Sequence, residues 1–272
     1  MVDKQRIEAG LEARLSRYLP FSLHLYDSVT STNQVLWELM QLGKPFGTVV
    51  IATQQTAGRG QWGRQWVSSQ GGLYLSVAIA PNIEARDSYL LTFATAWGIT
   101  QQLRNWNIPV EIKWPNDLVL NKLKLGGILT ETKISHGKIS QAVIGVGINY
   151  SNPVPTTGIN MESWLIGATK ALPQTIYSIE ILAEKVLLGI ESGIECLSQD
   201  GVDVLLPKYT SLLTNIGERV YLENVSGTVI GVTSTGCLHV RTLNFDSKSV
   251  DTPDLFLPPG TISLGYRNSS KQ

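Results

Sequence analysis

Residues 55–66 bring together, in one short loop, the residue types that hold an anion and a flat ring. The loop reads Gln-Thr-Ala-Gly-Arg-Gly-Gln-Trp-Gly-Arg-Gln-Trp and follows an apolar strand. Its glycines permit the positive φ angles that turn successive backbone N–H groups toward one anion, and Arg59 and Arg64 add charge-assisted hydrogen bonds. Trp62 and Trp66 offer apolar faces to a fused-ring ligand. We therefore favour a ligand-binding loop over a hairpin loop with solvated arginines.

A second candidate site begins at the turn Trp114-Pro115-Asn116-Asp117, inside a strand-like stretch from 110 to 120. Pro115 has no N–H for a β-ladder and biases the preceding residue toward extended geometry, so the strand breaks there. Asn116 and Asp117 then lie at a bend, where a short carboxylate can point at a metal or a ligand. Taken alone, this segment predicts only a turn.

The next two predicted strands add a lysine and several glycines. Lys124 stands at the start of a strand, beside Gly126-Gly127. An isolated lysine in that place is usually a solvated strand end. The following apolar strand contains Gly145 and Gly147, which let another group approach the backbone, and it ends at the amide of Asn149. These glycines are not a dinucleotide-binding fingerprint, because no third glycine opens a helix at the required spacing.

The order and spacing of four blocks resemble the biotin protein ligases, that is, the biotin–[acetyl-CoA-carboxylase] ligases. The blocks are Ser31-Thr32-Asn33, Gln55 to Trp66, Lys113 to Leu118 with Lys124 to Leu129, and Gly145 to Asn149. The family's Gly-Arg-Gly-Arg loop reads Gly58-Arg59-Gly60-Gln61 here, so neutral Gln61 stands where the family commonly has a cation. The sequence leaves open whether Arg64 or Lys124 supplies the missing charge.

The resemblance implies an enzyme that forms biotinyl-5′-AMP from biotin and ATP. The biotin would then pass to a lysine of the biotin carboxyl carrier protein domain of acetyl-CoA carboxylase. Catalytic roles fall to Lys124, Arg59 and Asp117, and Asp117 is also the implied Mg²⁺ ligand. The implied biotin- and nucleotide-binding residues are Ser31, Thr32, Asn33, Gln55, Gly58, Arg59, Gly60, Gln61, Arg64, Trp66, Lys113, Asn116, Lys124, Gly126 and Asn149.

Within this resemblance, Ser31, Thr32 and Gln55 would bind the ureido ring of biotin. The carbonyl and two N–H groups of that ring need both donors and acceptors, which these neutral side chains supply. Ser31 also has a structural explanation, because residues 31–34 match a capping box ahead of an apolar helix predicted at 32–42. Both roles are compatible, since a helix N-terminus is well placed to meet a polar ligand.

The resemblance implies further roles at the acid end of biotin. Lys124 would hold the biotin carboxylate against the α-phosphate of ATP, and Asp117 would engage Mg²⁺ or the adenylate. Trp66 would stack on adenine, and Asn149 would reach its polar edge. Because the enzyme mainly has to hold two anions together, positioning and cationic stabilisation should carry the catalysis. In agreement, the sequence has no recognisable nucleophile motif around its histidines, His24, His136 and His239.

Composition narrows the class of protein. Twenty-two basic residues balance 22 acidic ones, so the chain lacks a general electrostatic footprint for nucleic acid. It has neither a run long enough to cross a membrane nor a signal-peptide core, so we expect a cytoplasmic enzyme without a membrane partner. Two cysteines are too few for a four-ligand zinc site, and we expect Cys196 and Cys237 to be buried free thiols. We expect a monomer or a weak homodimer.

The predicted fold class is α+β, with a mixed, largely antiparallel sheet flanked by helices, as in the class II synthetase and biotin ligase group. We expect a catalytic domain at 1–215 and a small SH3-like β-barrel at 216–272, where short β-runs replace the helices. Residues 152–173 are predicted to be a surface excursion anchored by Trp164. Strands are predicted at 21–26, 48–53, 73–80, 110–113, 124–134, 138–149, 219–222, 227–232 and 238–242, and helices at 32–42, 88–105 and 178–197.

Two questions about function depend on particular segments. About twenty residues precede Phe21, enough for one short amphipathic helix but not for the winged helix of family members that repress biotin genes. We therefore expect a ligase without the repressor function.

The alternatives are a lipoate or octanoate ligase or transferase of the same fold, and a non-catalytic biotin sensor. The loop at 58–60 together with Lys113 to Asp117 favours biotin, and Lys124 with Asp117 argues against a sensor.

Overall fold

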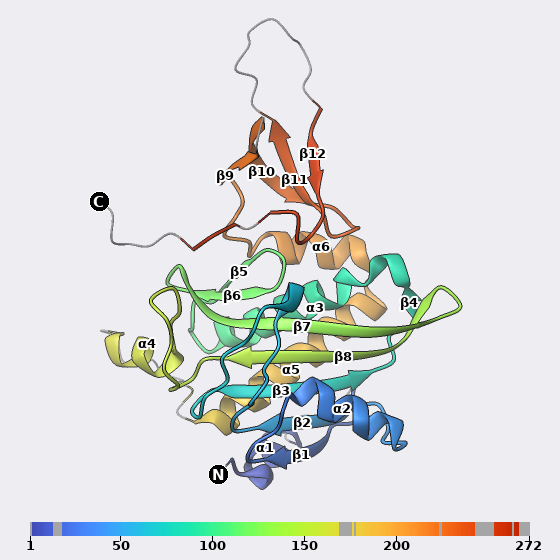
Figure 1. Cartoon of the computed structure of the whole chain (residues 1–272), viewed down its shortest axis with the longest axis vertical. Helices are drawn as coiled ribbons and strands as arrows, with labels where there is room; N and C mark the ends of the chain where they lie inside the picture. Colours follow the sequence, from blue (N-terminus) through green and yellow to red (C-terminus); the bar gives the residue numbers. More distant parts are fainter. Residues whose placement is uncertain are drawn as a thin grey trace, which may run out of the picture.

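The computed structural model describes residues 2–12, 18–168, 176, 178–222, 225–242, 253–262 and 264–266. A sheet flanked by helices forms the larger body, and a smaller group of C-terminal strands stands at one end of it (Figure 1). None of the described helices combines the length and the apolar character needed to cross a membrane.

The body is built on an eight-stranded sheet. Seven of its strands lie in the order β1-β2-β3-β8-β7-β6-β5, and the eighth, β4, pairs with β8. Strands β1 and β2 pair in parallel, and the remaining pairs among the described strands are antiparallel, which confirms the largely antiparallel sheet. The strands are β1 (Ser22–Tyr26), β2 (Thr48–Ala52), β3 (Leu73–Ile79), β4 (Ile83–Glu84), β5 (Glu111–Lys113), β6 (Asp117–Leu120), β7 (Leu123–Ser135) and β8 (Lys138–Ile148).

Helices cover both faces of the sheet, and the alternation of side chains along β2 shows how. Val49 and Ile51 belong to the main core, whereas Val50 packs with Leu36 of α2 (Thr32–Gln41) on the opposite face. The main core is covered by α3 (Tyr89–Asn105) and α5 (Ile179–Gln199), which lie behind the sheet in Figure 1.

Glycines allow α3 and α5 to approach closely. A Cβ atom on Gly98 of α3 would lie 2.0 Å from the carbonyl oxygen of Gly189 on α5. A Cβ atom on Gly193 would lie equally close, at 2.0 Å, to the carbonyl oxygen of Ala94. Larger residues at this crossing would force the helices apart and open the core beneath the sheet.

The predicted helices α2, α3 and α5 are confirmed, and so is the short N-terminal helix, α1 (Lys4–Glu12). Two helices were not predicted. One is α4 (Met161–Gly167), which lies in the segment expected to be an excursion; its Trp164 is half-buried and packs against the core, as expected. The other is α6 (Val202–Thr210), which contains Pro207, a residue that normally ends a helix.

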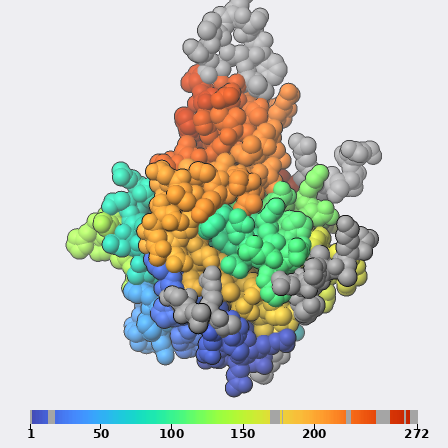
Figure 2. Space-filling view, turned by 180° about the vertical axis from the view of Figure 1, so that it is seen from behind, coloured from blue at the N-terminus to red at the C-terminus, as the bar shows by residue number. Residues whose placement is uncertain are grey.

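The C-terminal strands form an antiparallel sheet with the order β12-β11-β10-β9. Its strands are β9 (Arg219–Leu222), β10 (Val225–Val232), β11 (Leu238–Thr242) and β12 (Leu255–Leu257), of which β12 was not predicted. Viewed from behind, this sheet projects from the body beside the orange part of the chain that contains α6 (Figure 2). Val229 and Val240 are fully buried and belong to the main core, so the sheet shares its packing with the body. Both cysteines are free thiols, but Cys237 is only half-buried, which corrects that expectation.

Candidate active site

A cavity of about 350 Å³ gathers residues from five distant parts of the chain. Its walls come from the start of α2, the loop at 59–66, the turn between β5 and β6, the strands β7 and β8, and residues 260–262 and 264–266 near the C-terminus. The parallel pair β1–β2 and the antiparallel pairs β3–β8–β7–β6 carry these segments to the same region of the sheet. The predicted site residues that line it are Ser31, Thr32, Asn33, Gln55, Arg59, Gly60, Gln61, Arg64, Trp66, Lys113, Asn116, Asp117 and Lys124.

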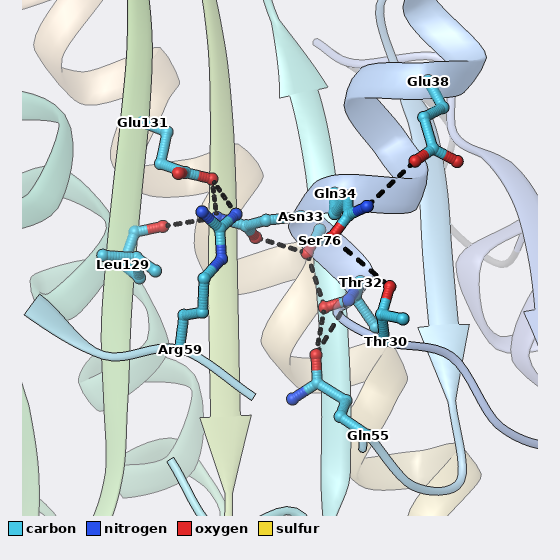
Figure 3. Close-up of polar contacts among 10 residues, drawn as sticks. All are labelled: Thr30, Thr32, Asn33, Gln34, Glu38, Gln55, Arg59, Ser76, Leu129 and Glu131. Atoms are coloured by element: carbon cyan, nitrogen blue, oxygen red, sulfur yellow. Dashed lines mark hydrogen bonds and ion pairs between the residues drawn. The ribbon is translucent and has the colours of Figure 1, made fainter. Parts of the chain in front are cut away.

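At one end of the cavity the side chain of Gln55 is fixed by hydrogen bonds. Its Oε1 accepts from the Thr32 backbone N at 2.8 Å and lies 3.2 Å from Thr32 Oγ1 (Figure 3). Its Nε2 donates to Ser68 Oγ at 2.7 Å. The amide therefore has one orientation, which presents a defined set of donors and acceptors to a neutral polar ligand.

Ser76 of β3 connects this group to the next one, and its role was not predicted. It is fully buried, and its Oγ lies 2.8 Å from Thr32 Oγ1 and 2.6 Å from Asn33 Oδ1 (Figure 3). A serine in a strand that is otherwise apolar and buried was the available signal. Because β3 places this hydroxyl under the first turn of α2, Ser76 sets the side-chain positions of two predicted biotin-binding residues.

Glu131 of β7 forms the other end of the same network. Its Oε2 accepts from Asn33 Nδ2 at 2.7 Å and from Arg59 Nη2 at 2.9 Å (Figure 3). Arg59, a predicted ligand-binding residue, therefore has an ion-pair partner within the protein. Both side chains are partly exposed, so this pair contributes at most about 1 kcal/mol and a bound anion can compete with it.

Ser31 occupies the N-cap position of α2 but does not form the predicted capping box. Its backbone is extended, its carbonyl accepts from Val35 N at 3.0 Å, and its side chain makes no capping bond. The side chain of Gln34 donates instead to Glu38 Oε1 at 3.1 Å. The reciprocal pair that defines a capping box is therefore missing, and Ser31 lines the cavity.

The glycines of the binding loop serve two different purposes. Gly63 has a φ of 71°, as expected, and its neighbour Trp62 has a φ of 59°. Gly60 has a φ of −117°, and Gly58 is also outside the positive-φ region, so the prediction was wrong for both. At Gly58 the requirement is space, because a Cβ atom would lie 2.4 Å from the carbonyl oxygen of Trp66.

Glycines on β8 make room for two side chains of the cavity wall. A Cβ atom on Gly145 would lie 2.2 Å from Asn33 Oδ1, and one on Gly147 would lie 2.5 Å from Trp66 Nε1. The expectation that these glycines admit another group is therefore confirmed, and the groups are Asn33 and Trp66. Trp66 Nε1 and Gln61 Oε1 are buried without a hydrogen-bond partner among the described residues, which leaves one donor and one acceptor unsatisfied at the cavity wall.

A second part of the cavity wall, around Lys124, carries charged groups that are paired. Lys124 Nζ lies 2.7 Å from Asp117 Oδ1, and Asp117 Oδ2 accepts from the hydroxyl of Tyr266 at 2.7 Å. The β6–β7 pairing sets Asp117 opposite Gly127, where a Cβ atom would lie at an ordinary contact distance of 3.6 Å from Asp117 Oδ1. Lys124 Nζ also lies 5.3 Å from the ring centroid of Trp66, within cation–π range.

Lys113 is buried beside this pair. Burial lowers the pKa of Lys113, and the nearby carboxylate of Asp117 partly opposes that shift. Its Nζ donates to the backbone oxygen of Gly265 at 2.5 Å and lies 3.6 Å from the ring centroid of Tyr266. Gly265 and Tyr266 were not predicted site residues, because their neighbours in sequence carry no recognisable motif.

The donor set at this end suits a magnesium ion that arrives with a nucleotide. The described residues contain no group of three or more histidines, cysteines or carboxylates that could form a metal cage. Mg²⁺ keeps several waters and is commonly held by one or two carboxylates together with substrate phosphates. Asp117, a single carboxylate in the cavity wall, fits that arrangement and does not fit a permanent metal centre.

Three of the predicted residues do not line the cavity: Gly58, Gly126 and Asn149. Asn149 is buried, and its side chain bonds to Asn152 at 3.0 Å and to the Lys124 carbonyl at 3.4 Å, so it supports the backbone that carries Lys124. Asn116 does line the cavity, but its Nδ2 donates to the Ile128 carbonyl at 2.8 Å. The ligand contacts assigned to these residues stay predictions.

Residues 25–149, which contain most of the cavity wall, match the model of the biotin/lipoate A/B protein ligase family. The chain is 28% identical over 238 residues to the bifunctional ligase/repressor BirA of Bacillus subtilis, covering 85% of this chain and 73% of that protein. It is 30% identical over 221 residues to BirA of Escherichia coli (77% and 66%) and 26% identical over 230 residues to the human biotin–protein ligase (80% and 32%).

Solved structures show the same fold. The biotin protein ligase of Aquifex aeolicus in complex with biotin and ATP has a TM-score of 0.63 and 24% identity, covering 82% of this chain and 95% of that one. The Leishmania major enzyme in complex with biotinyl-5-AMP has a TM-score of 0.57 and 21% identity, covering 88% and 99%. The fold is thus the α+β fold of the biotin ligases. The chain belongs to the biotin protein ligases of the biotin/lipoate A/B protein ligase family.

Proposed function

We propose that this biotin protein ligase activates biotin in the described cavity and transfers it to the biotin carboxyl carrier protein domain of acetyl-CoA carboxylase. One observation carries the proposal. A neutral hydrogen-bonding group around Gln55 and a charged group around Lys124 line a single cavity. Biotin has the matching polarity, with an uncharged ureido ring at one end and a carboxylate at the other.

The ureido ring would lie against Ser31, Thr32 and Gln55. The fixed amide of Gln55 and the hydroxyls beside it provide both donors and acceptors. Ser76 and Asn33 would act indirectly. Ser76 hydrogen-bonds to both Asn33 and Thr32, and these contacts hold Thr32 in place. The ureido ring is uncharged, so a charged side chain beside it would lose its water without gaining a charged partner. The lack of charge on Ser31, Thr32 and Gln55 therefore favours biotin as the ligand.

The carboxylate and the α-phosphate would meet at Lys124. To hold them, the ammonium of Lys124 exchanges its contact with Asp117 for contacts with the two anions. A carboxylate oxygen of biotin attacks the α-phosphorus, the bond from that phosphorus to the β-phosphate oxygen breaks, and pyrophosphate leaves with the electron pair. Arg59 and Arg64 would neutralise charge that develops on the phosphate oxygens. Mg²⁺, held by Asp117 and the phosphates, would supply further charge neutralisation.

The second step uses the same bound intermediate. The neutral amine of a carrier lysine attacks the carbonyl carbon of biotinyl-5′-AMP, the bond from that carbon to the phosphate oxygen breaks, and AMP leaves. An amide bond forms, and the amine loses a proton. Trp66 and the rest of the loop at 58–66 would cover the adenylate, so that water does not hydrolyse it first.

We also propose a domain organisation, a cellular location and an oligomeric state for this protein. We assign residues 1–215 to a catalytic domain and 216–272 to a small SH3-like domain, supported by the antiparallel order β12-β11-β10-β9. We further propose a cytoplasmic enzyme that acts as a monomer or a weak homodimer. The balance of 22 basic and 22 acidic residues supports a protein partner rather than a nucleic acid.

The test is transfer to a defined carrier. The protein is incubated with biotin, ATP, MgCl₂ and a purified biotin carboxyl carrier domain, and the carrier is digested and analysed by mass spectrometry. We expect the mass of one biotinyl group on a single carrier lysine, and none when ATP is left out or when that lysine is replaced by arginine. Formation of the adenylate without any transfer would contradict the proposed carrier.

A further inference from the structure

The residues at 264–266, which we name the tail segment, make three contacts with the charged end of the cavity. The carbonyl of Gly265 accepts from Lys113 Nζ at 2.5 Å, and the ring of Tyr266 lies 3.6 Å from the same ammonium. The hydroxyl of Tyr266 donates to Asp117 Oδ2 at 2.7 Å. A short stretch near the C-terminus thus engages two of the predicted nucleotide-binding residues at once.

The groups proposed to bind phosphate have partners within the protein. Lys113 is bound to the tail segment, and Asp117 is bound by both Tyr266 and Lys124. Arg59 is bound to Glu131. Among the cations of the cavity wall, Arg64 is the one whose side chain makes neither a hydrogen bond nor an ion pair within the described residues, and it is exposed. A polyphosphate therefore has to exchange with existing partners in order to reach these groups.

The Tyr266 contact is a hydrogen bond from a neutral phenol to a carboxylate. Burial, and then the charge of Asp117, raise the pKa of Tyr266 far above its ordinary value, so the hydroxyl keeps its proton over the working pH range. Hydrogen bonds to charged groups are stronger than neutral ones. The contact is thus one that a ligand of Asp117 has to displace.

We infer that the tail segment occupies the place where the polyphosphate of ATP meets Lys113 and Asp117, and that Tyr266 is a gating residue for nucleotide binding. The inference rests on the proposed function, because it takes ATP as the ligand of this end. Binding of ATP then requires the tail segment to release Asp117 and Lys113. Because ATP binds only the released state, the hydrogen bond from Tyr266 weakens the apparent affinity for ATP and leaves the affinity for biotin unchanged.

The conservative variant Tyr266→Phe removes the hydroxyl and keeps the ring. Affinity is measured by calorimetry with α,β-methylene-ATP and Mg²⁺, an analogue whose α–β bridge cannot be cleaved to pyrophosphate. We expect a roughly ten- to hundredfold lower Kd in Tyr266→Phe, the range set by losing one hydrogen bond to a charged group. Tyr266→Ala, which also removes the ring beside the Lys113 ammonium, should lower the Kd at least as far. The Kd for biotin alone should stay within twofold of that of the unmodified protein.

A matched control is Tyr221→Phe, because Tyr221 lies on β9, is 75% exposed and does not line the cavity. It should leave both affinities unchanged. An unchanged or higher Kd for the analogue in Tyr266→Phe would overturn the inference, since Tyr266 would then be neutral toward the nucleotide or support its binding. Biotin-dependent exchange of pyrophosphate into ATP by the unmodified protein is measured alongside. Its absence would contradict the proposed function, whereas exchange together with an unchanged Tyr266→Phe affinity would contradict the inference alone.

Discussion

The ammonium of Lys124 lies 2.7 Å from Oδ1 of Asp117, so the cation proposed to hold the substrates is neutralised by a carboxylate of the protein itself. Both side chains are largely shielded from solvent. Substrate binding therefore exchanges one charged partner of Lys124 for another and does not expose a bare cation. The ammonium of Lys124 therefore faces an opposite charge both before and after substrate binding, and this charge offsets the cost of removing the ammonium from water.

This relationship predicts a large effect of Lys124→Ala on adenylate formation. Losing a charge-assisted contact to a desolvated anion costs about 1.5 to 3 kcal/mol, or roughly ten- to a hundredfold in rate. Lys113→Ala should lose less, because Lys113 would gain the polyphosphate only by giving up the carbonyl of Gly265, whereas Lys124 would hold both reacting groups. The measurement is biotin-dependent exchange of pyrophosphate into ATP. Lys122→Ala is the control, because Lys122 is exposed and lies outside the cavity wall. Near-normal exchange by Lys124→Ala would show that the essential cation lies elsewhere.

Ser76→Ala should weaken biotin binding without touching the ligand-facing side chains. It removes the partner of Asn33 Oδ1 and Thr32 Oγ1 in a fully buried position, which should lower the free energy of unfolding by about 1 to 3 kcal/mol. We expect the Kd for biotin to rise roughly three- to tenfold, measured by titration of tryptophan fluorescence, with stability measured by urea denaturation.

The control for this prediction is Ser140→Ala, since Ser140 is exposed on β8. A loss of stability in Ser76→Ala with unchanged biotin affinity would mean that Ser76 supports the fold but does not position Thr32 and Asn33.

The loop at 58–66 should become protected from trypsin when biotin and ATP are bound. Arg59 and Arg64 are both cleavable, and ordering flexible glycine-rich backbone costs about 1 to 2 kcal/mol per residue, which ligand contacts can offset. Cleavage after Arg86, whose side chain is 81% exposed, serves as the internal control and should not change. Equal cleavage after Arg59 and Arg64 with and without ligands would indicate a preformed loop.

Glu131→Gln extends the same experiment. The substitution keeps an acceptor for Asn33 but removes the charge that holds Arg59. We expect faster cleavage after Arg59 in the free protein, by about fivefold at most, because a partly exposed ion pair contributes less than about 1 kcal/mol. The rates in the presence of both ligands should match those of the unmodified protein, and an unchanged rate in the free protein would show that Glu131 does not restrain the loop.

The sequence predicted those parts of the molecule in which short-range pattern and chemistry coincide. The strands at 48–53 and 73–80 and the helices at 88–105 and 178–197 have strong apolar periodicity, and the structure contains them as β2, β3, α3 and α5. Thirteen of the predicted residues line one cavity because they lie in blocks whose glycines and turns bring the backbone to the same edge of the sheet.

What the sequence did not indicate depends on contacts between distant segments. Ser76 carries no motif, and its role exists only because β3 passes under the first turn of α2. Tyr266 lies 149 residues from the carboxylate that it binds. The capping box failed for a local reason, since Gln34 has Glu38 one turn away as a competing partner. Helix α6 was missed because Pro207 outweighed a weak apolar pattern that tertiary packing supports.

The most direct test of the account compares two acids in the same assay. The protein is incubated with ATP, Mg²⁺ and labelled pyrophosphate, and the label entering ATP is measured with biotin, with lipoate or with neither acid. The neutral group of Ser31, Thr32 and Gln55 is suited to a ureido ring, so we expect exchange with biotin and only the background rate with lipoate. Equal stimulation by lipoate, or no stimulation by biotin, would contradict the account.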